Sequence, residues 1–256
     1  VASGGSITQS GNLTIGGTSS FTTSSTNETI TLSDTSLTNA LSGAFTLNST
    51  GENAHVTIDN GTTAIVITSA SVGGNLTLTS GAAAGITDNS STVTVGGNLY
   101  ATTDANNGII NMVKLAVDGS ISLTTNGTGN ATIVNDAGLN FATSTIGGDL
   151  TATATTLNII DSGRIKVTGA TIITLGTNPV LSVSGARSAT DVNGLKITLD
   201  TANNLFTGGI TLRYDNVAPP PDDNSDIYLA SQVAFAELLF AIDQNITKIY
   251  GSYGEM

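Results

Sequence analysis

The stretch Val72-Gly73-Gly74-Asn75-Leu76-Thr77-Leu78-Thr79-Ser80 decides the fold, because it recurs along the chain. A close copy begins at Val95 and reads Val-Gly-Gly-Asn-Leu-Tyr-Ala-Thr-Thr, and looser copies begin at Val117 and Ile146. In each copy a glycine-containing turn precedes a strict alternation of apolar and polar residues. This alternation is typical of a β-strand that buries one face, so the sequence predicts a strand that recurs with the same face inward.

Two longer repeats indicate that a larger module is duplicated. Ile7–Gly17 aligns without gaps to Ile159–Gly169, and a variant with one extra residue begins at Ile86. Ile30–Leu47 likewise matches Ile197–Leu212. Both repeats occur in the same order at the two ends of the chain, as a duplication predicts.

The spacing of the glycine turns favours a solenoid. Turns near positions 16, 43, 73, 96, 118, 147, 169 and 194 lie 22 to 30 residues apart, which fits one coil of a parallel β-helix with two or three strands. We expect an all-β parallel β-solenoid of roughly eight coils over residues 1–217. Its outward threonines would form polar ladders, and its inward positions would be Leu76, Leu78, Leu99, Ile121, Leu123 and Leu150. A Greek-key sandwich is the structural alternative, although it would not need repeats in the same phase.

The pattern stops after Asn216, and the tail has a different composition. We expect a Pro/Asp-rich linker over 218–226 that contains three consecutive prolines. Ser225 or Asp226 would then cap an amphipathic α-helix over 227–250, which caps the solenoid or docks to a partner. The apolar stretch is too short, and carries too many polar residues, for a membrane span.

Charge and composition exclude several function classes. The net charge is −12 and the first basic residue is Lys114, so the chain lacks the basic stripe that nucleic-acid binding needs. Hydrophobic residues make up 39 % of the chain, which argues against disorder over the repeats. The absence of cysteine suits a chain that is exported unfolded, and it equally fits chance or a reducing compartment. Val1–Gly5 shows no signal peptide and already matches the repeat pattern, so we expect the chain to be a piece of a longer protein.

Residues with catalytic potential are sparse. His55 is the single histidine, and without cysteine it has too few partners for a zinc site or a nucleophilic pair, so we expect it to be a structural side chain. We predict no enzyme, and no catalytic, cofactor-binding or metal residue, because the carboxylates occur singly in turn-like sequences, at Asp59, Asp88, Asp104, Asp118 and Asp149.

Two motifs imitate known sites. Asp222-x-Asn224-x-Asp226 begins like a calcium loop but lacks its glycine and distant glutamate, so we interpret it as linker. The threonine ladders resemble those of ice-binding solenoids, but the unequal intervals argue against a flat regular array.

The residue pattern of the repeats resembles that of a known family. Ile7–Gly17 and Val72–Leu78 are similar to the repeat region of large bacterial exoproteins of the filamentous-haemagglutinin type, and the resemblance covers roughly residues 1–215. It implies a right-handed parallel β-helix, export through an outer-membrane transporter and a secreted or cell-surface location. Adhesion, aggregation and biofilm formation are the functions that it implies, with no catalytic residue to carry over.

Two functions follow as hypotheses. The first is a non-enzymatic adhesive and structural segment of an adhesin, with host or neighbouring-cell surface molecules or glycans as partners. The second is a subunit of a self-assembling surface filament or layer, which would polymerise through open solenoid ends and the C-terminal helix.

Overall fold

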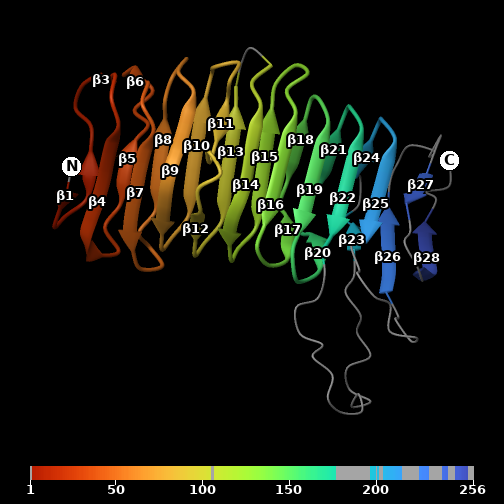
Figure 1. Ribbon diagram of the computed structural model, residues 1–256. Helices are drawn as coiled ribbons and strands as arrows, with labels where there is room; N and C mark the ends of the chain where they lie inside the picture. The colour runs from red at the N-terminus through yellow and green to blue at the C-terminus, as the bar shows by residue number, and fades with distance from the viewer. Residues whose placement is uncertain are drawn as a thin grey trace, which may run out of the picture.

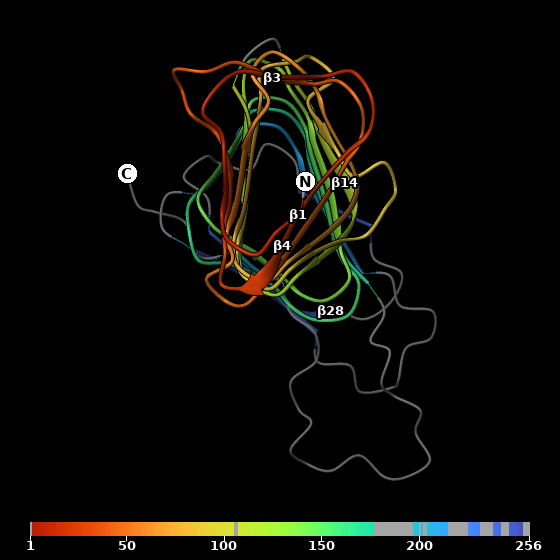
Figure 2. The ribbon, with the colours of Figure 1, turned by 90° about the vertical axis from the view of Figure 1, so that its left-hand side faces the viewer.

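The computed structural model describes residues 2–104, 107–176, 197–199, 201 and 204–214, together with the backbone of three later strands, 225–230, 238–241 and 246–252. In these residues the chain winds into a parallel β-solenoid, as the repeats predict (Figure 1). It completes eight coils between the first strand, β1 (Ala2–Ser3), and β22 (Thr171–Leu175). Seen from one end, the described coils superimpose as closed loops around a common interior (Figure 2).

Two long sheets form the walls, and every strand pair in them is parallel. Sheet A consists in order of β1, β4 (Ser19–Thr26), β7 (Phe45–Thr50), β9 (Ile65–Val72), β11 (Ile86–Thr87) with β12 (Val93–Val95), β14 (Ile110–Val117), β16 (Ala131–Asn135), β19 (Leu150–Ala154), β22, β25 (Ile210–Tyr214) and β27 (Leu238–Ala241). Sheet B consists of β2 (Ile7–Thr8), β5 (Ile30–Leu32), β8 (Val56–Asp59), β10 (Leu76–Ser80), β13 (Leu99–Thr103), β15 (Ile121–Thr125), β17 (Leu139–Phe141) with β18 (Ser144–Ile146), β20 (Ile159–Asp161) with β21 (Ile165–Val167), β23 (Ile197–Leu199) with β24 (Leu205–Phe206), β26 (Ser225–Ala230) and β28 (Ile246–Ser252). A third sheet pairs β3 (Leu13–Ile15) with β6 (Asn39–Leu41).

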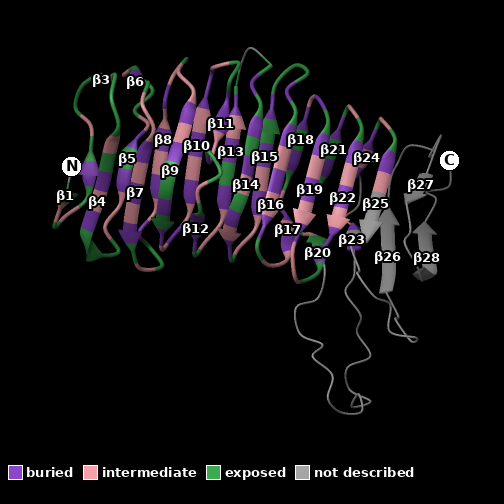
Figure 3. Cartoon of the chain, in the orientation of Figure 1, coloured by how far each residue is buried: buried purple, intermediate pink, exposed green. Residues whose placement is uncertain are grey.

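The core is a set of stacked columns that the alternation predicted. Leu76 of β10 pairs in register with Val56 on one side and with Leu99 on the other, and Leu99 pairs with Ile121. All six leucines and isoleucines that the sequence assigned to the interior are buried. Buried and more exposed positions therefore alternate along the strands (Figure 3). Each buried side chain of this size stabilises the fold by about 1.5–3 kcal/mol.

The helix expected over 227–250 is wrong where the structure describes this stretch. The chain forms strands β26, β27 and β28 there, and they continue the two sheets. The expected cap at Ser225 or Asp226 falls inside β26, while residues 218–224 of the linker lie outside the described residues. The physical reason is the open strand edge of the preceding coil. Ile227 and Leu229 alternate in register with Ile197 and Leu199, and this template outweighs a weak helix propensity.

No helix in the described residues is long and apolar enough to span a membrane.

Candidate functional surface

The Gly-Gly-Asn turns stack on one another at a corner of the solenoid. The amide of Gly97 donates to the carbonyl of Gly74 at 3.0 Å, and the amide of Gly119 donates to the carbonyl of Gly97 at 3.0 Å. A Cβ atom on Gly97 would lie 2.9 Å from the carbonyl oxygen of Gly74, and one on Gly96 would lie 2.7 Å from that of Gly73. The repeat therefore needs glycine because neighbouring backbones approach closely, and not because of an unusual φ.

The residue after each glycine pair links successive coils through its side chain. Asn75 Oδ1 accepts a hydrogen bond from the backbone amide of Asn98, and Asn98 Oδ1 accepts one from the amide of Ser120, both at 2.8 Å. His55 stands at the start of this ladder, where its Nδ1 accepts a hydrogen bond from the amide of Asn75 at 2.9 Å. The structure thus gives the single histidine of the chain a place in a turn.

A second ladder crosses the later coils. Asn130 Oδ1 accepts from the amide of Asp149, and Asp149 Oδ1 accepts from the amide of Ala170, again at 2.8 Å. An aspartate thus fills an asparagine position with the same geometry, because each position requires only a side-chain oxygen acceptor.

Buried asparagines occupy a different set of positions, where they replace a missing strand. Asn60 is fully buried, and its Oδ1 accepts from the amide of Leu41 at 2.8 Å while its Nδ2 donates to the carbonyl of Leu41 at 3.1 Å. Asn135 does the same for Val117, with distances of 2.9 and 3.1 Å. The side-chain amide therefore satisfies a buried backbone amide and carbonyl on the side of the strand where no neighbouring strand pairs with them.

Each of the two copies of the duplicated module contains an equivalent polar pair. Asn39 is 3 % exposed and exchanges two hydrogen bonds with Gln9, at 2.9 and 3.0 Å. Asn204 is fully buried, and its Nδ2 donates to Asp161 Oδ2 at 2.5 Å. In the alignment of the repeats Gln9 corresponds to Asp161, and Asn39 corresponds to Asn204. Sequence reasoning missed both pairs, although their matching places in the two copies were the available signal.

The scattered carboxylates accept hydrogen bonds from backbone amides, mostly within turns. Asp88 is 1 % exposed, and its carboxylate accepts from the amides of Ser90 at 2.9 Å and Lys114 at 2.6 Å. It opens an arc between β11 and β12 in which Asn89 and Ser90 both adopt positive φ, at 47° and 58°. Asp59 accepts from the amide of Gly61 at 2.9 Å.

The remaining acidic positions stay apart. Asp104 and Asp118 lie exposed at turns, and no three His, Cys, Asp or Glu side chains in the described residues come close enough to hold a metal ion. Hydrogen bonds from the side chain and the backbone amide of Ser36 lower the pKa of Asp34, which is fully exposed. The calcium-like motif at 222–226 lies outside the described residues, apart from the backbone of its last two positions.

The outward side of sheet B over β8, β10, β13 and β15 carries two columns of small polar residues, which we call the hydroxyl face. One column runs Thr57, Thr77, Tyr100, Ser122, and the other runs Asp59, Thr79, Thr102, Thr124. The strands pair residue for residue without a shift. The turns between these strands, near positions 73, 96 and 118, are 23 and 22 residues apart, so this face does not include the longest intervals.

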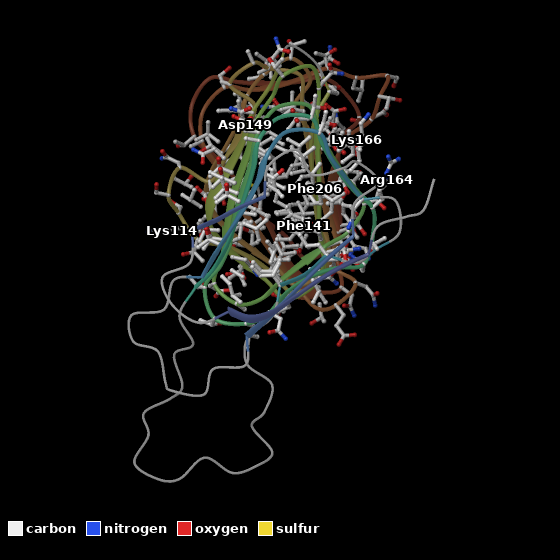
Figure 4. All side chains as sticks on the ribbon, turned by 90° about the vertical axis from the view of Figure 1, so that its right-hand side faces the viewer. Lys114, Phe141, Asp149, Arg164, Lys166 and Phe206 are labelled. Carbon is white, nitrogen blue, oxygen red and sulfur yellow. The ribbon has the colours of Figure 1, made fainter. Side chains whose placement is uncertain are left out.

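Basic side chains lie outside the four strands of the hydroxyl face. Lys114 belongs to β14 of sheet A, whereas Lys166 of β21 continues the second column beyond Thr124 and Thr145, two strands after β15. In the end-on view Lys114 lies across the solenoid from Arg164 and Lys166 (Figure 4).

Comparison with known proteins identifies a repeat family. The family model described as repeats of unknown function (DUF5649) matches residues 1–48 and 128–213, just over half of the chain, so the chain belongs to this family. The two matches contain the two copies of the duplicated module that begin at Ile7 and Ile159. No curated protein and no solved structure matches the chain.

Proposed function

We propose that this member of the DUF5649 repeats is a non-enzymatic, adhesive and structural segment of a surface exoprotein. The observation that carries the proposal is the hydroxyl face, an uninterrupted set of outward positions on a stacked shaft. At ~4.8 Å per coil, eight coils give a shaft on the order of 40 Å long. Such a shaft can hold a ligand-contacting surface away from the structure that anchors it.

The resemblance to filamentous-haemagglutinin-type exoproteins supports the same proposal and adds detail to it. We expect a right-handed winding, because parallel crossover connections almost always have that hand. We further propose a secreted or cell-surface location that is reached through an outer-membrane transporter. The expected partners are molecules or glycans on host or neighbouring cells.

A binding assay with the purified chain tests the adhesive function. The fluorescently labelled chain is incubated with epithelial cells and with bacterial cells, and its retention is compared with that of the heat-unfolded chain. Saturable retention that competes with unlabelled chain is expected. Retention equal to that of the unfolded chain on both kinds of cell would overturn the proposal.

Negative-stain electron microscopy of the same sample tests the alternative. Isolated short rods are expected for an adhesin segment, whereas filaments that lengthen with concentration would favour a polymer subunit. Sedimentation velocity over the same concentration range gives an independent measure of assembly.

A further inference from the structure

Tyr100 departs from its surroundings on the hydroxyl face. It occupies the position held by Thr77 on the preceding strand and by Ser122 on the following one, and its side chain is 37 % exposed. The phenylalanines of the described residues are buried instead, with Phe45 and Phe141 fully so. Among the side chains that the structure describes, Tyr100 is the one exposed aromatic.

The solenoid has no need of this ring. A cross-strand pair on an outward sheet face contributes only about 0.2–1 kcal/mol, and a threonine at position 100 would continue the ladder equally well. Asn98 Nδ2 lies 3.4 Å from the Tyr100 hydroxyl and donates to it, so the ring is held by the same asparagine that links two coils. The aromatic face is therefore both exposed and positioned.

The hydroxyl groups around the ring are free to bind a ligand. The side-chain hydroxyls of the neighbouring threonines have no hydrogen-bond partner within the part of the chain that the structure describes, and these are Thr57, Thr77, Thr79, Thr102 and Thr124. Each hydroxyl can donate one hydrogen bond and accept two. The ring thus stands among fixed groups that both donate and accept.

The charges on this face decide between classes of ligand. Asp59 is the charged residue of its two columns over β8 to β15, and the face presents no cation there. An anionic polymer needs cations to replace its counterions, so nucleic acid and acidic polysaccharides are disfavoured. A protein partner needs an apolar interface core larger than one exposed ring.

We propose that Tyr100 and the hydroxyls of Thr77, Thr79 and Thr102 bind one pyranose unit of an extended neutral polysaccharide. The C–H face of the sugar stacks on the aromatic ring, and its hydroxyls exchange hydrogen bonds with the threonines. This inference rests on the proposed adhesive function, because it names the class of ligand that the hydroxyl face binds.

Affinity electrophoresis of the intact chain tests the proposal. The gels contain mannan, β-glucan or starch as neutral polysaccharides, and alginate or polygalacturonate as acidic ones. We expect at least one neutral polysaccharide to retard the chain, with weaker or no retardation by the acidic ones. No retardation in any neutral gel, or stronger retardation in the acidic gels, would overturn the proposal.

Four variants locate the site. Tyr100→Thr installs the residue of the neighbouring strand and leaves the ladder intact, and we expect it to lose about tenfold in affinity, as Tyr100→Ala does. Tyr100→Phe keeps the ring and should stay close to the parent. Thr153→Ala on sheet A is the matched control and should change nothing. Unaltered retardation of Tyr100→Thr would refute the assignment.

The cell assay separates this inference from the function on which it rests. If the parent chain and Tyr100→Thr bind cells equally, and neutral polysaccharide does not compete, the inference fails while the adhesive function stands. If the parent chain does not bind cells at all, the adhesive function fails. Thermal melting by circular dichroism confirms that all variants are folded.

Discussion

Substitution of Gly97 by alanine should destabilise the solenoid strongly, although the site lies at a turn. The new Cβ atom would lie 2.9 Å from the carbonyl oxygen of Gly74 and would also meet the side-chain oxygen of Asn75. The two coils must then separate by a few tenths of an ångström. We expect a cost of about 1–3 kcal/mol for overpacking, because the closest atom, Asn75 Oδ1, is held in a hydrogen bond between coils and the next two atoms belong to the backbone of Gly74.

The separation should also weaken the hydrogen bonds at this corner. The amide of Gly97 bonds to the carbonyl of Gly74 at 3.0 Å, and Asn75 Oδ1 accepts from the amide of Asn98 at 2.8 Å. Partial loss of this pair adds about 1 kcal/mol, so we expect a total of about 2–4 kcal/mol. That is a large share of the stability of an ordinary domain.

Urea unfolding followed by circular dichroism at 218 nm measures the effect. Gly17→Ala is the matched control, because Gly17 also ends a Gly-Gly pair but a Cβ atom there meets nothing within 4 Å. We expect the control to be neutral or slightly stabilising. If both variants shift the urea midpoint equally, close backbone approach is not the reason for the repeated glycines.

Three further substitutions probe the interior, and one outward substitution serves as a control. Leu78→Ala should cost about 2–5 kcal/mol in urea unfolding because Leu78 is fully buried, whereas the control Thr79→Ala on the outward face should cost less than about 0.5 kcal/mol. Asn60→Ala should cost about 2–5 kcal/mol in the same assay, because it leaves the buried amide and carbonyl of Leu41 without partners. A change below about 0.5 kcal/mol would show that the Asn60 side chain does not take the place of a strand at this position. Asn204→Leu should lose about 1–3 kcal/mol and accelerate hydrogen exchange at the amide of Ile165, which donates to Asn204 Oδ1 at 2.8 Å; unchanged exchange would refute this link.

The strands of the shaft could be predicted because their signal is local. A strand such as Leu76–Ser80 shows its alternation within five residues, and the preceding Gly-Gly-Asn marks where the coil bends. Repetition then supplies the parallel register, because copies of one motif stack most easily in phase. Inward and outward faces were therefore both accessible from the sequence.

The tail and the polar pairs lacked such a signal. Residues 231–239 contain alanine, leucine, glutamine and glutamate, which favour a helix when considered alone. The strands around them form on the exposed edge of β23 and β25, and that edge exists only after the solenoid has folded. The partners Asp161 and Asn204 are 43 residues apart, and only the stacking of two coils brings them together.

The asymmetry between inward and outward positions explains where function can change in this fold. Inward residues such as Leu99 are fixed by stacking, and corner residues such as Gly97 are fixed by backbone contact. Outward residues meet neither constraint, so substitutions there change the surface at little cost in stability. Tyr100 lies one position from buried Leu99 on the same strand, and the shaft therefore positions the ring while leaving its identity free. Single substitutions at outward positions can therefore change which ligand this face binds without disturbing the coils beneath them.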